Sequence, residues 1–211
     1  MNDQENKPED LKKIMEDLHE TKRQFKTLVD NLPGMVYRCN NDRSWNIELV
    51  SNGCVELTGF TPADFTVSKR VSFNELIIPE DRERVWNEIQ QAIANQQIYS
   101  IEYRIKCADG KVKWVWEKGK SRSNEQEKHS HIEGFISDIS TQKHAKLIRE
   151  VLLEISKAAY TSASIEELYK VIHKNLGLII DVENFYMAMY DEKTKSITLP
   201  YQIDSKDHFA I

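Results

Sequence analysis

Residues 98–122 read IYSIEYRIKCADGKVKWVWEKGKSR, and the pattern in them is the main indication of the fold class. Apolar and polar residues alternate on both sides of Ala108-Asp109-Gly110, which is typical of strands that bury one face and expose the other. Asp-Gly between two alternating runs is a strong signal for a β-hairpin. The stretch therefore predicts two long antiparallel strands, at 98–107 and 111–122.

The sequence on either side of this hairpin supplies the rest of a sheet and its helices. The expected elements are strands at 35–39 and 45–50, short helical turns within 52–76, a helix from 79 to about 95, and a last strand at 132–138. This order predicts an α+β fold with a five-stranded antiparallel sheet and helices inserted between strands 2 and 3. No βαβ alternation or glycine-rich phosphate loop is present in the sequence, which excludes a dinucleotide-binding fold.

A long helix is expected on each side of this sheet. In residues 9–32 and again in 139–160, apolar residues recur in steps of three and four. A period of about 3.5 residues is typical of a coiled-coil seam, so we predict a homodimer. The seam residues are Leu11, Ile14, Leu18, Phe25, Leu28, Ile148, Leu152 and Ile155. The alternative is that each helix packs on its own domain.

Composition limits the possible partners. The 211 residues carry 29 Lys+Arg and 34 Asp+Glu, a formal net charge of −5, whereas proteins that bind nucleic acid are usually basic. The 3 cysteines are isolated in the sequence, so neither a disulfide framework nor a zinc site is expected. The sequence has no apolar run of about 18 residues and its polar start does not fit a signal peptide. We therefore expect a cytoplasmic chain with no nucleic-acid partner and no membrane segment.

No group of residues has the spacing of a catalytic or metal site. Asp81 and Glu88 could share a helix face, but such carboxylates are more typical of a solvated surface. His129 and His131 have no third ligand nearby in the sequence. We predict no catalytic residue and no metal site in these residues.

Five stretches, taken together and in order, resemble a PAS domain of the subclass found in bacterial sensor proteins. They are FKTLVDNLPGMVYRCNND at 25–42, SNGCVELTGFTPADF at 51–65, IIPEDRERVW at 77–86, IEYRIKCADGKVKWVWEKGKSR at 101–122 and IEGFISDISTQKHA at 132–145. The resemblance covers about residues 25–142 and departs at Ile78, where the subclass often has His. Residues from 151 onward resemble the opening of a GAF domain, which would be truncated here.

The resemblance implies a domain organisation and a function. The implied segments are an N-terminal coiled-coil helix at 1–32, a PAS domain at 33–139, a connector helix at 140–160 and the start of a truncated GAF domain, an incomplete α/β segment, at 161–211. This layout is similar to the input half of sensor histidine kinases. The implied role is sensory input and dimerisation in a cytoplasmic two-component phosphorelay, with kinase domains downstream in a longer parent chain. The alternatives are the input region of a diguanylate cyclase and a ligand-free interaction module.

The resemblance also implies two sites. Asp138-Ile139-Ser140-Thr141 is similar to the signal-coupling motif at the exit of PAS domains, where Asp138 is expected to bond the backbone at the strand-to-helix turn. No flavin or haem is predicted, because 66–76 lacks the flavin-binding Cys and 79–96 lacks the haem-binding His; an unknown small ligand stays open. The candidate pocket residues are Val36, Tyr37, Leu57, Phe73, Leu76, Ile89, Tyr103, Trp116 and Phe135. The alternative is that these residues simply fill the core.

Overall fold

The computed structural model describes residues 7–123 and 130–204. Contacts between residues divide the chain into two compact units, 1–140 and 141–211, and each is described by itself. The first unit holds the elements from α1 to β5. The second holds α7, a hairpin and nearly all of α6, which begins at the last residue of the first unit.

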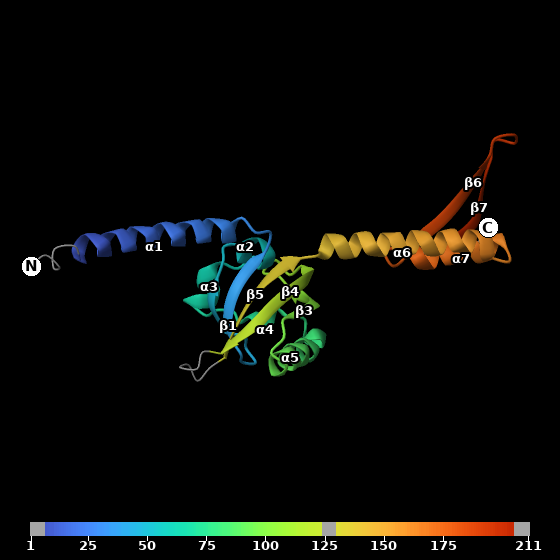
Figure 1. Ribbon diagram of the computed structural model, residues 1–211. Helices are drawn as coiled ribbons and strands as arrows, with labels where there is room; N and C mark the ends of the chain where they lie inside the picture. Colours follow the sequence, from blue (N-terminus) through green and yellow to red (C-terminus); the bar gives the residue numbers. More distant parts are fainter. Residues whose placement is uncertain (1–6, 124–129, 205–211) are drawn as a thin grey trace, which may run out of the picture. The chain divides into compact units, whose positions relative to one another are not determined.

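The first unit is built on a five-stranded sheet in the order β2-β1-β5-β4-β3, and every neighbouring pair is antiparallel (Figure 1). The strands are β1 Met35–Asn40, β2 Ile47–Val50, β3 Tyr99–Lys106, β4 Val112–Ser123 and β5 Ser130–Asp138. The predicted β3–β4 hairpin is confirmed, and Gly110 takes a φ of 85° in its turn, which glycine adopts without strain. Since β5 lies between β1 and β4, the last strand of the unit completes the sheet.

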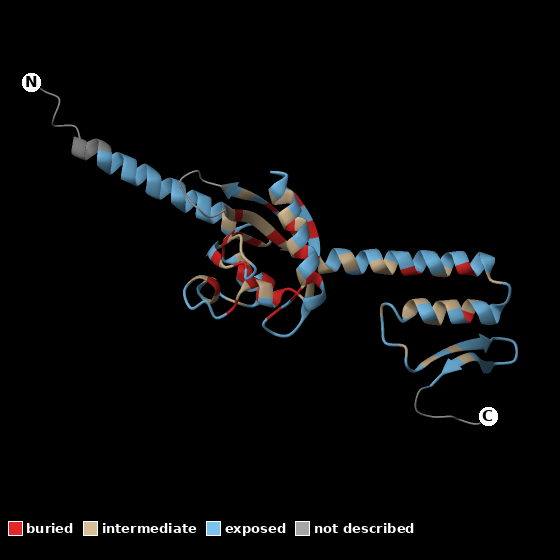
Figure 2. Cartoon of the chain, turned by 90° about the horizontal axis from the view of Figure 1, so that it is seen from below, coloured by how far each residue is buried: buried red, intermediate tan, exposed pale blue. Residues whose placement is uncertain are grey.

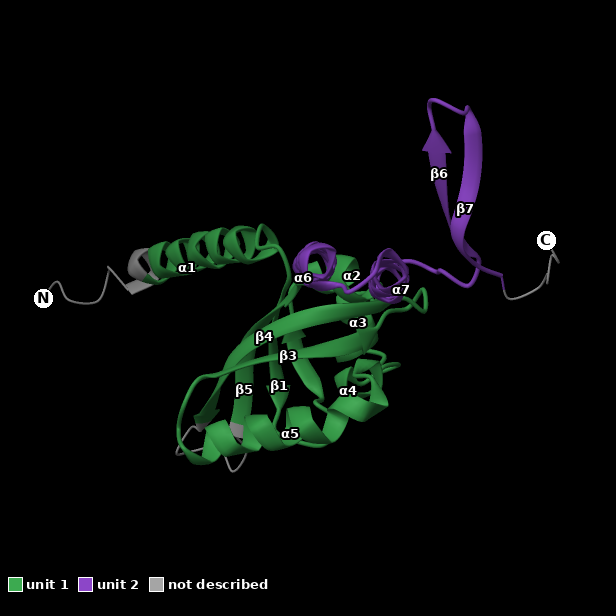
Figure 3. Ribbon diagram, turned by 90° about the vertical axis from the view of Figure 1, so that its right-hand side faces the viewer, with its two compact units in different colours: residues 1–140 green, residues 141–211 purple. Residues whose placement is uncertain are grey.

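Four helices lie in the sequence between β2 and β3. They are α2 Gly53–Thr58, α3 Pro62–Thr66, α4 Phe73–Leu76 and α5 Pro79–Ala94. Buried residues of the first unit lie on its strands and its helices (Figure 2). Strand side chains alternate between the two faces, so that Tyr99, Ile101, Tyr103 and Ile105 of β3 are all buried. The inward residues of the sheet and the apolar residues of the helices form one core, with the helices on one side of the sheet (Figure 3). This arrangement confirms the predicted α+β fold.

Local chemistry sets where the short helices begin. Thr61 precedes α3, Pro62 occupies its first position, and the Asp64 carboxylate accepts a hydrogen bond from the Thr61 N–H at 2.8 Å. In α4, the Glu75 carboxylate accepts from the Ser72 N–H at 3.0 Å. Both carboxylates lie at the positive end of their helix dipole. Helices this short are not stable alone, so their packing on the sheet must supply the remaining stability.

The second unit has two helices and a two-stranded hairpin. Its elements are α6 Ser140–Thr161, α7 Ile165–Leu176, β6 Phe185–Asp191 and β7 Ser196–Ile203. Ser164 caps α7 by accepting from the Glu167 N–H at 3.2 Å, while the Glu167 carboxylate accepts from the Ala163 N–H at 2.8 Å. Most residues of this unit are exposed in Figure 2. It therefore has little core of its own.

The predicted seam residues differ in exposure between the two long helices. In α1, which spans Lys7–Asp30, all five are exposed, by 60% at Leu11 and up to 69% at Leu28. In α6, Leu152 is exposed and Ile148 and Ile155 are half-buried. The buried residues of α6 are Val151 and Ala158, on a stripe next to the predicted one. The homodimer through these residues stays a prediction, as does the division into four segments.

Two boundaries differ from those expected. The strand expected at 45–50 begins at Ile47, because Trp45 has a φ of 50° and belongs to the preceding turn. The first helix ends at Asp30 rather than at Leu32. Across the described ranges, none of the helices is both long and apolar enough to cross a membrane.

Candidate functional site

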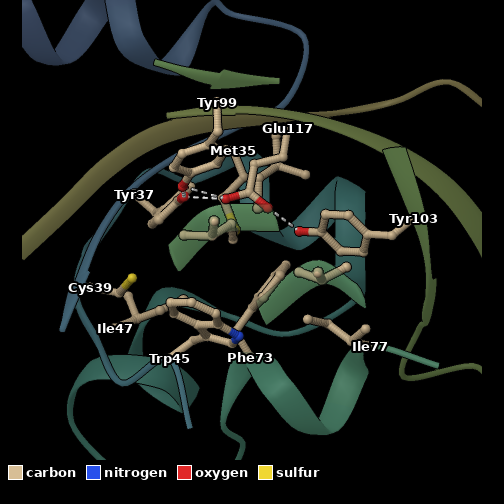
Figure 4. Close-up of a pocket in the computed structure, with 13 residues that line it drawn as sticks. Met35, Tyr37, Cys39, Trp45, Ile47, Phe73, Ile77, Tyr99, Tyr103 and Glu117 are labelled. Atoms are coloured by element: carbon tan, nitrogen blue, oxygen red, sulfur yellow. Dashed lines mark hydrogen bonds between the residues drawn. The ribbon is translucent and has the colours of Figure 1, made fainter. Parts of the chain in front are cut away.

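A small cavity lies between the inner face of the sheet and the helices α4 and α5 (Figure 4). Its volume, counted as space open to the centre of a water molecule, is about 10 Å³, which is room for about one water. Most of the lining side chains are apolar, but Tyr37, Tyr99, Tyr103 and Glu117 bring polar groups into it. A ligand of several non-hydrogen atoms would fit only if these side chains moved.

Glu117 of β4 lies at the centre of the polar groups. Its side chain is 4% exposed, and the three tyrosines surround its carboxyl group. The Tyr99 hydroxyl is hydrogen-bonded to Glu117 Oε1 at 2.9 Å, the Tyr37 hydroxyl is hydrogen-bonded to the same oxygen, and Tyr103 donates to Oε2. The hydroxyls of Tyr37 and Tyr99 also lie 2.6 Å apart. We call these four residues the Glu117 cluster.

Two glycines make room for the tyrosine rings. Across the sheet, Tyr99 pairs with Gly119, Gly119 with Gly134, and Gly134 with Tyr37, so all four residues lie in one row on the inner face. A Cβ atom at Gly119 would lie 2.4 Å from the Tyr99 hydroxyl, and one at Gly134 would lie 2.8 Å from the Tyr37 hydroxyl. Each ring therefore covers a glycine, and this lets the two hydroxyls meet beside Glu117.

The surroundings of the Glu117 cluster favour uncharged groups. Burial, the largest effect, raises the pKa of Glu117 above its ordinary value of 4.5, while hydrogen bonds from Tyr103, Tyr37 and Tyr99 act in the opposite direction. Burial and the charge of Glu117 raise the pKa of all three tyrosines well above 10.0. Burial likewise raises the pKa of the Cys39 thiol, which also lines the cavity. The tyrosines and Cys39 therefore keep their protons at neutral pH.

The structure brings only part of the predicted pocket together. Tyr37, Phe73, Ile89 and Tyr103 line the cavity, whereas Leu57 and Leu76 are buried in the core outside it. Val36, Trp116 and Phe135 require a correction, because they lie on the opposite face of the sheet. Neighbours along a strand point to opposite faces, so Val36 cannot share the cavity with Tyr37, nor Trp116 with Glu117.

Sequence reasoning missed Glu117 and Tyr99. A charged residue in an alternating strand normally marks the solvated face, and here it lies inside. Alternation along β3 could have found Tyr99, because it is two residues from Ile101 and four from Tyr103, which was predicted. Glu117 is aligned with Ile101 across the hairpin, which places it on the same face.

The exit turn after β5 contains the predicted hydrogen bond. Asp138 Oδ1 accepts from the Ser140 N–H at 2.8 Å, and Lys113 Nζ lies 3.4 Å from Asp138 Oδ2. Partial burial opposes ionisation, but the bonds from Ser140 and the charge of Lys113 lower the pKa of Asp138 overall. Trp114 of β4 holds the turn as well, because its N–H donates to Ser140 Oγ at 3.0 Å and its carbonyl accepts from the Ile139 N–H at 2.9 Å.

The other acidic and histidine residues considered in the sequence have local partners. Asp81 is 7% exposed and binds Arg104 through both carboxylate oxygens, each at 3.0 Å, so it is not part of a carboxylate pair with Glu88. His131 Nδ1 lies 3.2 Å from Glu48 Oε2, and His129 lies outside the described residues. In the part of the chain that the structure describes, no three His, Cys, Asp or Glu residues gather as a metal site would require.

Comparisons with known proteins agree with this fold. Residues 47–136 match the family model described as PAS fold. The chain is 27% identical over 150 residues to the Methyl sulfide methyltransferase-associated sensor of Methanosarcina acetivorans, covering 71% of this chain and 15% of that protein. It is 24% identical over 160 residues to the Blue-light-activated histidine kinase of Brucella ovis, covering 74% and 30%. The chain thus spans less than a third of these relatives.

Solved structures show the same fold at lower identity. A sensory box histidine kinase/response regulator from Burkholderia thailandensis matches with a TM-score of 0.51 and 19% identity, over 64% of this chain and 98% of that one. The PAS domain of an HTR-like protein from Haloarcula marismortui matches with a TM-score of 0.50 and 19% identity, over 61% and 99%. The five-stranded sheet and its inserted helices therefore have the PAS fold.

Proposed function

We propose that this PAS domain is the sensory input and dimerisation region of a cytoplasmic two-component sensor histidine kinase. The observation that carries the proposal is the exit turn, in which Trp114 of β4 is bonded to both Ile139 and Ser140 at the start of α6. A sensor and a histidine kinase are among the relatives whose sequences match most of this chain. The kinase domains would lie downstream in a longer parent chain.

The proposed relay runs from the sheet into the helix. A change at the inner face moves β4, β4 moves the exit turn through Trp114, and the turn changes the position of the first residues of α6. A stimulus can drive this change only to the extent that it binds two states of the domain with different affinity. The role of Asp138 is to hold the turn, because its carboxylate bonds both Ser140 and Lys113.

Dimerisation is proposed through α1 and α6. The five seam residues of α1 are at least 60% exposed on a helix of 24 residues, which is just over three heptads. Exposed apolar side chains with this spacing are what a parallel coiled coil buries against its partner helix. Native mass spectrometry of the 211-residue chain tests this directly. A mass of twice 24.7 kDa is expected, and Leu18→Glu should convert the dimer to monomer.

The second unit is proposed to be the beginning of a GAF domain. Its hairpin exposes large apolar side chains, among them Tyr186, Met189 and Ile197, which an additional layer of structure would bury. The aromatic residues His173, Phe185 and Tyr201 pack together between α7 and the hairpin, with ring centres 5.0–6.2 Å apart. They would form one end of the larger core.

A ligand-free interaction module is the second candidate function. The observation in its favour is the cavity, which has room for about one water. For this reason we propose neither a flavin nor a haem, and a small ligand only if the lining side chains rearrange. Native mass spectrometry separates the two functions, because a retained small molecule adds mass to the dimer and a scaffold adds none.

The relay is tested by Asp138→Ala in the parent kinase. We expect a change in the basal level of autophosphorylation or in its response to the stimulus, because the exit turn loses two of its bonds. Asp109→Ala is the matched control: Asp109 also accepts a backbone N–H within a turn, from Lys111 at 3.0 Å, but its bonds are to Lys111 and not to the residues of the exit turn. Equal phosphorylation in both variants and the wild type would contradict the relay.

A further inference from the structure

Three oxygen atoms of the Glu117 cluster form a closed triangle. Tyr37 and Tyr99 are bonded hydroxyl to hydroxyl at 2.6 Å, Tyr99 is bonded to Glu117 Oε1 at 2.9 Å, and Tyr37 is bonded to the same carboxyl oxygen. Each pair of the triangle is therefore within hydrogen-bond distance. The fourth member, Tyr103, bonds the other carboxyl oxygen and lies outside the triangle.

The number of protons in this triangle depends on the charge of Glu117. If Glu117 is ionised, the two tyrosine hydroxyls supply two protons for three contacts, so one pair of oxygens has no proton between them. If Glu117 is protonated on Oε1, three protons serve three contacts and the ring of hydrogen bonds is complete. Tyr103 then donates to the carbonyl oxygen of the acid, which is its natural acceptor. The observed arrangement therefore fits the neutral acid.

The surroundings of the triangle contain no positive charge among the described residues. The titratable groups that face it are Tyr37 and Cys39 from β1 and Tyr99 and Tyr103 from β3. The residues that face it from β5 and from the helices are apolar, namely Ile136, Phe73, Val85 and Ile89. The buried acidic residue of α5, Asp81, is bound by Arg104. An ionised Glu117 would thus be a buried charge without a counterion, which is costly.

We propose that Glu117 is a proton-binding site, held as a neutral carboxylic acid at neutral pH, and that loss of its proton as the pH rises is an input that β4 passes to the exit turn. On deprotonation the O–H bond of the acid breaks, the electron pair stays on the carboxylate and the proton leaves to solvent. The triangle then has one proton too few, and the tyrosine hydroxyls must rearrange.

The path to the exit turn is short. Glu117 and Trp114 are three residues apart on β4, and Trp114 holds Ile139 and Ser140. Glu117 is also aligned with Ile136 of β5, two residues before Asp138. Both strands that lead to the turn therefore pass through the site. This link to the exit rests on the signalling role proposed above, whereas the charge state of Glu117 does not.

The charge state is tested by infrared difference spectroscopy of the 211-residue chain. We expect a carbonyl stretch of a protonated carboxylic acid in the wild type at neutral pH, lost in Glu117→Gln and kept in Glu102→Gln. Glu102 is the matched control, since it lies on β3 on the exposed face of the sheet. If Glu117→Gln removes a carboxylate band instead, the proposal is wrong. Carbon NMR of the Glu117 carboxyl in the wild-type chain gives the same answer if the Gln variant does not fold.

The link to the exit turn is tested by hydrogen exchange of the Ile139 and Trp114 amides across the same pH range. The ratio of wild-type to Glu117→Gln exchange removes the intrinsic pH dependence of the amides. We expect this ratio to rise about fivefold, the lower end of typical coupling between sites, as Glu117 loses its proton. A constant ratio would overturn the pH input alone. The relay itself is tested separately, by Asp138→Ala.

Discussion

Two buried carboxyl groups of the first unit are stabilised in opposite ways. Asp81 at the start of α5 is 7% exposed and Glu117 on β4 is 4% exposed, so burial alone does not distinguish them. Asp81 faces the guanidinium of Arg104, and the hydrogen bonds from Arg104 lower its pKa. Glu117 faces three neutral hydroxyls, and burial raises its pKa. The two groups differ because the hydrogen bonds from Arg104 outweigh the burial of Asp81, whereas the hydroxyls around Glu117 do not outweigh its burial.

The largest effect is expected for Glu117→Ala. In this variant the three buried tyrosine hydroxyls lose their bonds to the carboxyl group, and at most the bond between Tyr37 and Tyr99 remains. The variant also opens space in the core. We expect a loss of about 3 kcal/mol in the free energy of unfolding, measured by urea denaturation. Glu102→Ala on the exposed face should change it by less than about 0.5 kcal/mol. Similar losses in both variants would show that the cluster contributes nothing specific.

A smaller effect is expected for Gly119→Ala. The new methyl group would lie 2.4 Å from the Tyr99 hydroxyl, so the ring must leave its position over the glycine. We expect a loss of about 2 kcal/mol by thermal or urea unfolding, as for other overpacked cores. Lys120→Ala, one residue along on the outer face, is the control. Full stability in Gly119→Ala would mean that Tyr99 can be moved without cost.

Arg104→Ala should lower the free energy of unfolding by less than Gly119→Ala does in the same measurement. The Arg104 side chain is 36% exposed, so solvent screens the ion pair, and Asp81 keeps its bond from the Arg104 backbone N–H at 3.0 Å. Arg84→Ala, which removes a more distant cation 3.8 Å from Asp81, should cost less. If Arg104→Ala costs as much as Glu117→Ala, the contrast between the two carboxyl groups is wrong.

The smallest effects are expected in the pH dependence of stability. A raised pKa means that the folded state binds the proton more tightly, so the contribution of Glu117 is complete below about pH 4.5 and declines as the pH rises toward its folded pKa. Glu117→Gln should remove this decline. The lowered pKa of Asp81 gives the opposite sign: its contribution is complete above pH 3.8 and is lost as the pH falls further. Asp81→Asn should remove the loss of stability at acidic pH and leave the decline caused by Glu117 unchanged.

Much of the fold could be predicted from the sequence because its signals are local. The Asp-Gly turn specifies the β3–β4 hairpin, and Thr61-Pro62 and Ser164 with Glu167 mark helix starts that the structure contains. The site was harder to predict, since it depends on which face of each strand is inward. On β4 the tryptophans Trp114 and Trp116 lie on the outer face and Glu117 lies on the inner one. Hydrophobicity alone would predict the reverse. The register with β3 and β5 resolves this, because it aligns Glu117 with the buried residues Ile101 and Ile136.

The Tyr37–Tyr99 contact has a mechanical consequence. The two residues belong to β1 and β3, which are separated by β5 and β4, a span of about three strand spacings of 4.8 Å each. Their hydroxyls nevertheless meet at 2.6 Å, because each side chain lies over the glycine of the neighbouring strand, and the pair bridges the inner face of the sheet. A flatter sheet would move these two inward side chains apart, and a more curved sheet would bring them together. Because both hydroxyls bond Glu117 Oε1, we expect the curvature of the sheet and the acidity of Glu117 to change together.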